Sequence, residues 1–309
     1  MIKKLRKFTI FTILFDSVKA FGQSESMTFA ASIAFYTIFS MPALLVIVLN
    51  IGATFYSRGE VRDELLAQIS DLSGMEMANM LDEIIYNAAL DVDGFWARTI
   101  AIGVLVFSAT TVFVSLQNSI NHIWHIKPKP EKGLIKFVVN RLLSFSMVAS
   151  IGFVLLISLV IDTAIVIFFN ELSMLFEGLS SYLAAITNFI ITQAMMVLIF
   201  GLMYKILPDA QVKWRSVWLG AFCTMLLFAL GKYLIGFYLG NSDIGSAYGA
   251  AGSLVIFLVW VYYSVIIFLY GAQVTFYIAE NTGRGIKPVK NAVKIQVKEI
   301  EDTEDIEED

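Results

Sequence analysis

A run of polar side chains, two of them histidines, interrupts a segment that is otherwise apolar. The spacing alternates between three and four residues, which places them all on one face of a single helix. The stripe consists of Ser108, Thr111, Ser115, Asn118, His122 and His125. Unsatisfied polar groups are costly in hydrocarbon, so this face must turn toward the protein interior. There it would serve either hydrogen bonding between helices or a hydrophilic cavity or pathway.

The two histidines are a weak basis for a metal site. Their spacing of three residues suits metal ligands, but the chain has no third histidine. The nearest carboxylate in sequence, Glu131, lies beyond two prolines. P-loop, nucleophile-elbow and zinc-hydrolase motifs are absent as well. We therefore expect no metal, no cofactor and no enzymatic activity.

Two further ionisable groups, Asp162 and Lys232, lie deep in apolar sequence and carry opposite charges. Each is expected about eight residues from the same end of its helix, or roughly 12 Å at ~1.5 Å per residue. Charges within a membrane are functional candidates and tend to pair. One interpretation is an ion pair that faces the interior. In the other, Lys232 extends outward to the membrane surface and Asp162 lies near that surface.

The elements that must position these residues are six long apolar stretches. They run approximately over 28–55, 96–126, 141–169, 182–207, 217–239 and 248–279. Each reaches the ~20 residues that cross a ~30 Å hydrocarbon layer. The composition, 58% hydrophobic and 16% charged, excludes an ordinary soluble protein. The sequence predicts an all-α integral membrane protein, a bundle of six transmembrane helices with amphipathic interfacial helices.

The basic residues predict the orientation. Eighteen of the 22 Lys and Arg residues lie before the first stretch, after the sixth, or in the second and fourth connections. Cytoplasmic segments carry such an excess. We therefore expect a multi-pass protein of the cytoplasmic (inner) membrane with both termini in the cytoplasm.

Three segments flank or interrupt the membrane domain, 26–282. Residues 1–25 are expected to form a cytoplasmic interfacial amphipathic helix with Phe11, Leu14, Val18 and Phe21 on its apolar face. Residues 56–95 show two apolar stripes divided by Ser73-Gly74, which predicts an outer helical hairpin. This hairpin either caps the bundle or covers a cavity as a lid. Residues 283–309, rich in acids, are expected to be a disordered cytoplasmic tail.

Other polar or small residues are candidates for lining an interior. Thr28, Ser32, Tyr36 and Ser40 form a second polar ladder on the first stretch. Small residues from Gly245 to Ser253 open the sixth stretch and favour close helix packing or, alternatively, a substrate contact. The candidates that we assign to a cavity are Tyr36, Ser115, Asn118, His122, Asp162, Lys232, Tyr248 and Gln273.

The chain resembles the YihY / virulence-factor BrkB family of inner-membrane proteins, formerly mislabelled ribonuclease BN, over about residues 10–285. The residues that carry the resemblance are Ala34-x-Tyr36 with Pro42, Asn118 to Trp124, Leu207-Pro208, Trp214-Arg215 with Gly220-Ala221, Ser246-x-Tyr248-Gly249-Ala250-x-Gly252-Ser253, Trp260-x-Tyr262 and Gly271-Ala272. The resemblance implies a six-helix membrane protein whose activity is unsettled, with proposals centred on envelope transport. Ribonuclease activity is not expected, because the chain has neither a metal-ligand cluster nor a basic groove with stacking aromatics.

These observations favour a transporter or flippase-like protein for a lipid-related or amphiphilic solute. The alternative is a non-catalytic envelope scaffold or assembly protein whose polar interior only holds the helices together. Membrane lipids are the expected partners, and nucleic acid is not. The sequence leaves open whether the chain forms a homo-oligomer.

Overall fold

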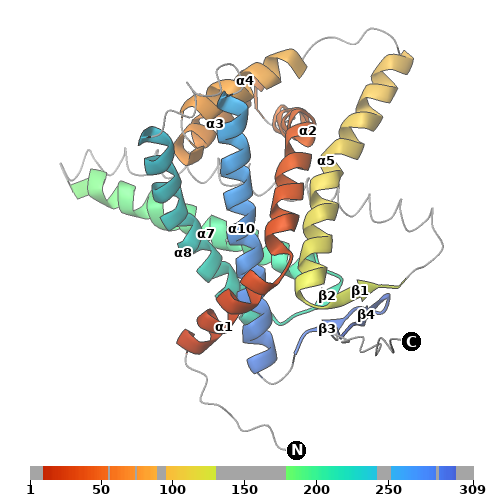
Figure 1. The fold of residues 1–309 in the computed structure, drawn as a ribbon. Helices are drawn as coiled ribbons and strands as arrows, with labels where there is room; N and C mark the ends of the chain where they lie inside the picture. Colours follow the sequence, from red (N-terminus) through yellow and green to blue (C-terminus); the bar gives the residue numbers. More distant parts are fainter. Residues whose placement is uncertain are drawn as a thin grey trace, which may run out of the picture.

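The structure, a computed structural model, describes residues 10–54, 56–73, 75–88, 95–129, 179–241, 252–282 and 285–296. The expected third stretch and the small-residue segment 245–251 lie outside the described residues. The described part is a helical bundle with short strands at one end (Figure 1). Its long helices are α2 (Ser26–Gly52), α5 (Phe95–Ile123), α7 (Leu179–Ile206), α8 (Trp214–Asn241) and α10 (Gly252–Asn281).

Helix α10 is the central element of the described bundle. It packs against α8 on one side and α2 on the other, and it also touches α1 (Ile10–Gln23), α5 and α4 (Met75–Ala88) (Figure 1). Its sequence is apolar almost throughout, as a helix surrounded by other helices requires. Three helices of the described part, α7, α8 and α10, contain stretches long and apolar enough to cross a membrane: 189–206, 214–238 and 254–281.

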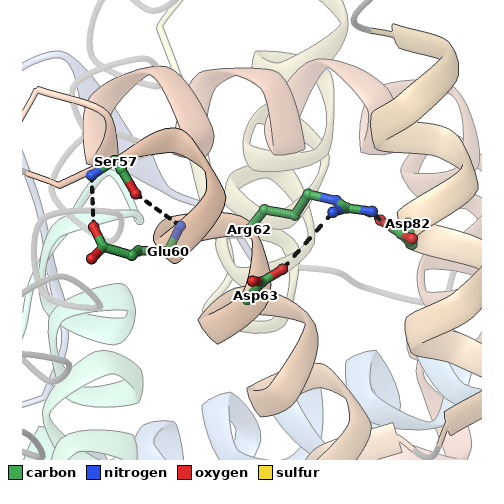
Figure 2. A network of polar contacts seen from close by, with 5 residues as sticks. All are labelled: Ser57, Glu60, Arg62, Asp63 and Asp82. Carbon is green, nitrogen blue, oxygen red and sulfur yellow. Dashed lines mark hydrogen bonds and ion pairs between the residues drawn. The ribbon is translucent and has the colours of Figure 1, made fainter.

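Two shorter helices, α3 (Arg58–Ser73) and α4, form a hairpin across one end of the bundle (Figure 1). They occupy the segment in which two apolar stripes predict amphipathic helices. A capping box starts α3: the Ser57 hydroxyl accepts a hydrogen bond from the Glu60 amide at 3.2 Å, and the Glu60 carboxylate accepts one from the Ser57 amide at 2.9 Å (Figure 2). These bonds lower the pKa of the Glu60 carboxyl.

The hairpin is fastened internally and to the bundle. The Arg62 Nε on α3 donates a hydrogen bond to the Asp82 carboxylate on α4 at 2.7 Å, and Asp63 lies beside the same guanidinium (Figure 2). Val61 is buried against Gly52 at the end of α2, where any larger residue would collide with it. The hairpin therefore sits directly on the helices below it.

The opposite end, here called the strand end, is closed by two antiparallel strand pairs (Figure 1). Strand β1 (Ile126–Pro128) follows α5 and pairs with β4 (Ala292–Lys294). Strand β2 (Ala210–Gln211) follows α7 and pairs with β3 (Lys287–Pro288). The segment 285–296 thus binds the two connections that follow α5 and α7.

This pairing corrects the expected tail. Residues 285–296, assigned above to a disordered segment, are ordered, because Ile286 and Ala292 are buried in the main core and the backbone pairs on both sides. They precede the acidic run 299–309, and the composition of that run is the basis of the predicted disorder. That run lies outside the described residues.

Helix α1 packs on α10 at the strand end. Phe21 is buried edge-on against Tyr270, with ring centroids 5.7 Å apart, and the Tyr270 hydroxyl donates to the Leu14 carbonyl at 3.3 Å. Val18, expected on the same face, is instead 57% exposed, and Ser17 is fully buried in its place. The buried face of α1 therefore includes Ser17 in place of Val18, which the apolar pattern places there.

Candidate functional site

Two glycine–threonine pairs bring α8 and α10 into close contact. A Cβ atom at Gly220 would overlap the Thr275 hydroxyl, and one at Gly271 would overlap the Thr224 hydroxyl. Each threonine also donates a 2.8 Å hydrogen bond to the glycine carbonyl four residues earlier in its own helix. The two antiparallel helices therefore interlock through matching Gly-x3-Thr motifs, which allow close backbone approach.

Tyr204 on α7 joins this crossing. Its hydroxyl lies 2.8 Å from the Thr224 hydroxyl and 2.7 Å from the Phe268 carbonyl, and its ring stacks on Phe268 at 5.0 Å. Tyr204 is fully buried. Helices α7, α8 and α10 are thus held in one fixed arrangement by a dry hydrogen-bonded cluster.

A cavity of about 350 Å³ lies between this crossing and the hairpin. Residues of α2, α3, α4, α5, α7, α8 and α10 line it: Met41, Leu45, Ile69, Met77, Leu81, Leu116, Phe200, Met203, Phe228, Phe257, Trp260, Val261, Ser264, Val265 and Phe268. Its volume is at the lower end of the ~300–1,000 Å³ typical of small-molecule sites. Ile69, Met77 and Leu81 make the hairpin part of the wall, which is the placement expected of a lid.

The cavity is almost entirely apolar, and Ser264 carries the only hydroxyl among the described residues that line it. Other buried hydroxyls of the described helices, such as Thr37 and Ser119, donate to a carbonyl one turn back. The buried Ser264 hydroxyl has no hydrogen-bond partner among the described residues. A buried polar atom without a protein partner requires an explanation, and the Ser264 hydroxyl is free to bond to an occupant of the cavity.

Ordered water is a poor occupant of this space. A buried water needs two to four polar partners, and the described part of the wall offers one hydroxyl. The physical chemistry of the wall therefore favours an apolar occupant.

The polar stripe of α5 does not reach this cavity. Ser115 is half-buried, whereas Asn118 and His122 are exposed. The His122 ring lies edge-on to Phe29 of α2, with centroids 5.0 Å apart. Leu116, beside Ser115 in sequence, lines the cavity instead. The hydrophilic cavity expected along this stripe stays a prediction.

The remaining sequence candidates are distributed over other helices. Tyr36 of α2 is 42% exposed, Lys232 of α8 is half-buried and Gln273 of α10 is buried. None of these three lines the apolar cavity. Asp162 and Tyr248 lie outside the described residues, so the pairing of Asp162 with Lys232 stays a prediction.

Sequence reasoning missed the contacts that hold the strand end together. Asn121 of α5, which flanks the polar stripe, makes a reciprocal pair with Asp209: its amide donates to the carboxylate and its oxygen accepts from the Asp209 amide, both at 2.9 Å. One turn away, the fully buried Trp124 indole donates to the Ala272 carbonyl at 2.9 Å. The only sequence signal for these pairs was the placement of polar residues at the end of a long apolar helix.

His125 follows α5 and turns the chain into β1. Its φ of 55° is in the left-handed region, which ends helices but is uncommon for a side-chain-bearing residue. Its ring packs edge-on against Phe276 at 5.6 Å, and its carbonyl accepts a 2.8 Å bond from the Ile295 amide. Desolvation chiefly lowers the pKa of His125, aided by the charges of His122 and Lys294 and opposed by Glu280.

The described bundle, with three helices able to cross a membrane around an apolar cavity, defines a helical integral membrane protein. The chain belongs to the family described as "Virulence factor BrkB", which it matches over residues 17–296. This confirms the resemblance seen in the sequence. No solved structure matches the chain.

Relatives in several bacteria carry the name "UPF0761 membrane protein". One in Pseudoalteromonas atlantica is 26% identical over 82% of this chain and 81% of its own length. Another, in Idiomarina loihiensis, is 28% identical over 68% of this chain and 69% of its own length. A third, in Alkalilimnicola ehrlichii, is 29% identical over 82% of this chain but only 55% of the relative. Their names agree with a membrane location and state no activity.

Proposed function

We propose that the protein is a transporter or flippase-like protein for a lipid-related or amphiphilic solute in the cytoplasmic membrane. The observation that carries the proposal is the apolar cavity of about 350 Å³ within the bundle. A solute that leaves the bilayer through a protein needs an interior that accepts its apolar part, and this wall has that chemistry. Activity would not depend on ATP bound to this chain, which has no P-loop motif.

The topology that we propose is six spans with both termini in the cytoplasm, supported by the distribution of Lys and Arg. In that orientation the strand end faces the cytoplasm and the α3–α4 hairpin faces outward. The polar head of the solute would follow the polar residues assigned from the sequence. These are Tyr36, Ser115, Asn118, His122, Asp162, Lys232, Tyr248 and Gln273.

The proposal is tested by reconstituting the purified full chain into liposomes that contain fluorescent lipid analogues and single-chain amphiphiles. Appearance of the label on the opposite leaflet is measured with a membrane-impermeant quencher. Ser264→Leu, which fills the cavity, should slow this movement. Thr192→Leu, a change to the same residue at an exposed position of α7, should leave it unchanged. If no probe from a broad panel moves faster than in protein-free liposomes, the proposal is wrong.

The alternative is a non-catalytic envelope scaffold. The strand end favours it, because segment 285–296 ties two inter-helix connections into one rigid unit. In that case Ser264→Leu would leave cellular function intact, whereas variants that break the strand pairing would abolish it. The two proposals thus place the sensitive residues at opposite ends of the bundle.

A further inference from the structure

We propose that the cavity beneath the α3–α4 hairpin binds one unbranched hydrocarbon chain. The chain could come from a fatty acid, a lysophospholipid or one tail of a diacyl lipid. This inference rests on the proposed function, because a bound chain matters for transport only if the protein moves lipid-related solutes. Binding itself can be measured without any transport.

The size of the cavity limits the occupant. Its 350 Å³ corresponds to about a dozen water-sized volumes of ~30 Å³ each. That is room for much of one hydrocarbon chain inside the cavity, and the rest of a larger molecule would lie outside its open side. A diacyl lipid would therefore insert a single tail.

The wall suits a chain of variable conformation. Three methionines line it, Met41 from α2, Met77 from α4 and Met203 from α7. Methionine is unbranched and polarisable, so it adapts to an irregular apolar partner. The aromatic side of the wall is more rigid: Trp260 lies edge-on to Phe228, with ring centroids 6.2 Å apart. A wall that combines flexible methionine side chains with more rigid aromatic rings can adapt to a flexible chain.

The uncharged wall is unfavourable for a charged lipid headgroup. No charged residue is among the described residues that line the cavity, and an unpaired charge there would lose its hydration without compensation. The single hydroxyl of the described wall, that of Ser264, can donate at most one hydrogen bond to an occupant. The head must therefore stay outside while the tail occupies the cavity.

The hairpin would sense the occupant. Ile69 of α3 and Met77 and Leu81 of α4 line the cavity on the side of the hairpin. Residues of the bundle helices line the rest of it. A bound chain would bridge the two and add apolar contacts that the empty hairpin lacks. Chain binding should therefore slow amide exchange in α3 and α4, and it should not affect β1 and β4 at the strand end.

The experiment uses the full chain in a detergent that chain ligands can displace, with Trp260 as the reporter. A long-chain fatty acid brominated at mid-chain, a brominated lysophospholipid and a brominated diacyl phospholipid are titrated in turn. We expect saturable fluorescence quenching by all three, reversed by the unbrominated fatty acid. The difference between the wild type and Trp260→Phe isolates the quenching of Trp260 from that of the other tryptophans.

Two variants decide the outcome. Ser264→Leu should weaken the saturable quenching by at least about tenfold. Thr192→Leu should bind like the wild type. Equal quenching in the wild type and Ser264→Leu, or quenching that never saturates, would overturn the inference. Quenching by the free fatty acid alone would assign the site to free chains, and quenching by all three probes would assign it to tails in general. Intact binding with no movement of any probe in liposomes would instead overturn the proposed transport.

Discussion

Thr224 of α8 occupies the space that a side chain at Gly271 of α10 would need, and Gly220 and Thr275 repeat the relationship one turn away. Each helix thus supplies both a gap and the group that fills the partner's gap. Because each hydroxyl is satisfied by its own helix, the contact introduces no unpaired polar atom. This crossing determines how close α8 and α10 lie on one side of the cavity, to which they contribute Phe228 and Phe268.

Substituting Gly271 with Ala should destabilise the protein. The added methyl would overlap the hydroxyls of Thr224 and Tyr204, both in a dry hydrogen-bonded cluster. Overpacking of this kind costs about 1–3 kcal/mol. Thermal unfolding in detergent measures the effect. Gly236→Ala is the matched control, because nothing lies within 4 Å of the position of its Cβ in the same bundle. Equal melting temperatures for both variants would contradict the interlocked crossing.

Substituting Asn121 with Leu should also destabilise the protein, at the strand end. Leucine has a similar shape but leaves the Asp209 amide and carboxylate without their partners. Removing one partner of a buried pair costs about 1–3 kcal/mol. Asn118→Leu, less than one turn away and exposed, is the control and should change stability by no more than ~0.5 kcal/mol. If Asn118 lines a polar pathway as proposed, this control should lose transport while keeping its melting temperature.

The Arg62–Asp82 pair should contribute little to stability despite its good geometry. Their side chains are 41% and 36% exposed, so water and salt screen the interaction. A double-mutant cycle with Arg62→Ala and Asp82→Ala should give a coupling of about 0.2–1 kcal/mol that falls with added salt. A larger, salt-insensitive coupling would show that the hairpin is locked, and not simply resting on apolar contacts.

The stability of the protein should depend on the protonation of His125. Its pKa in the folded protein lies below the ordinary value of 6.5, so between these two values the unfolded chain binds more protons. The free energy of unfolding should therefore fall as the pH drops through this interval and should be independent of His125 above it. Melting temperatures between about pH 8 and about pH 5 report the effect.

His125→Asn is the matched variant for this measurement. Asparagine tolerates the left-handed backbone at this position, where φ is 55°, but does not titrate. The variant should lose part of the decrease in melting temperature below about pH 6.5. An identical pH profile in both proteins would contradict the assignment of this pH dependence to His125.

The sequence predicts the positions of some helices and strands better than those of others. The helices near 28–55, 96–126, 182–207 and 217–239 correspond to α2, α5, α7 and α8, because long apolar runs leave the backbone no other way to satisfy its hydrogen bonds. The spacing that predicts the hairpin is equally local. The order of segment 285–296 could not be predicted, because two- and three-residue strands have no periodicity to detect.

The cavity could not have been predicted either. Polar residues at helical spacing predict an interior lined by Ser115, Asn118 and His122, which stays a prediction. The cavity of the described part is a different one, lined by Met41, Phe257 and other apolar side chains. The wall residues are indistinguishable in sequence from ordinary core or lipid-facing residues. Ser264, which carries the hydroxyl of the described wall, lies in a long apolar helix and gave no signal of its own.

The sequence by itself determined the class of protein, the positions of the helices and the family, because hydrophobicity and motif spacing are properties of the linear chain. Only the tertiary structure decided that Thr224 fits Gly271, that Asn121 pairs with Asp209, and that apolar residues from seven helices surround one cavity. These relationships join residues far apart in the chain. They depend on how the helices cross and how far apart they lie, which local spacing does not encode.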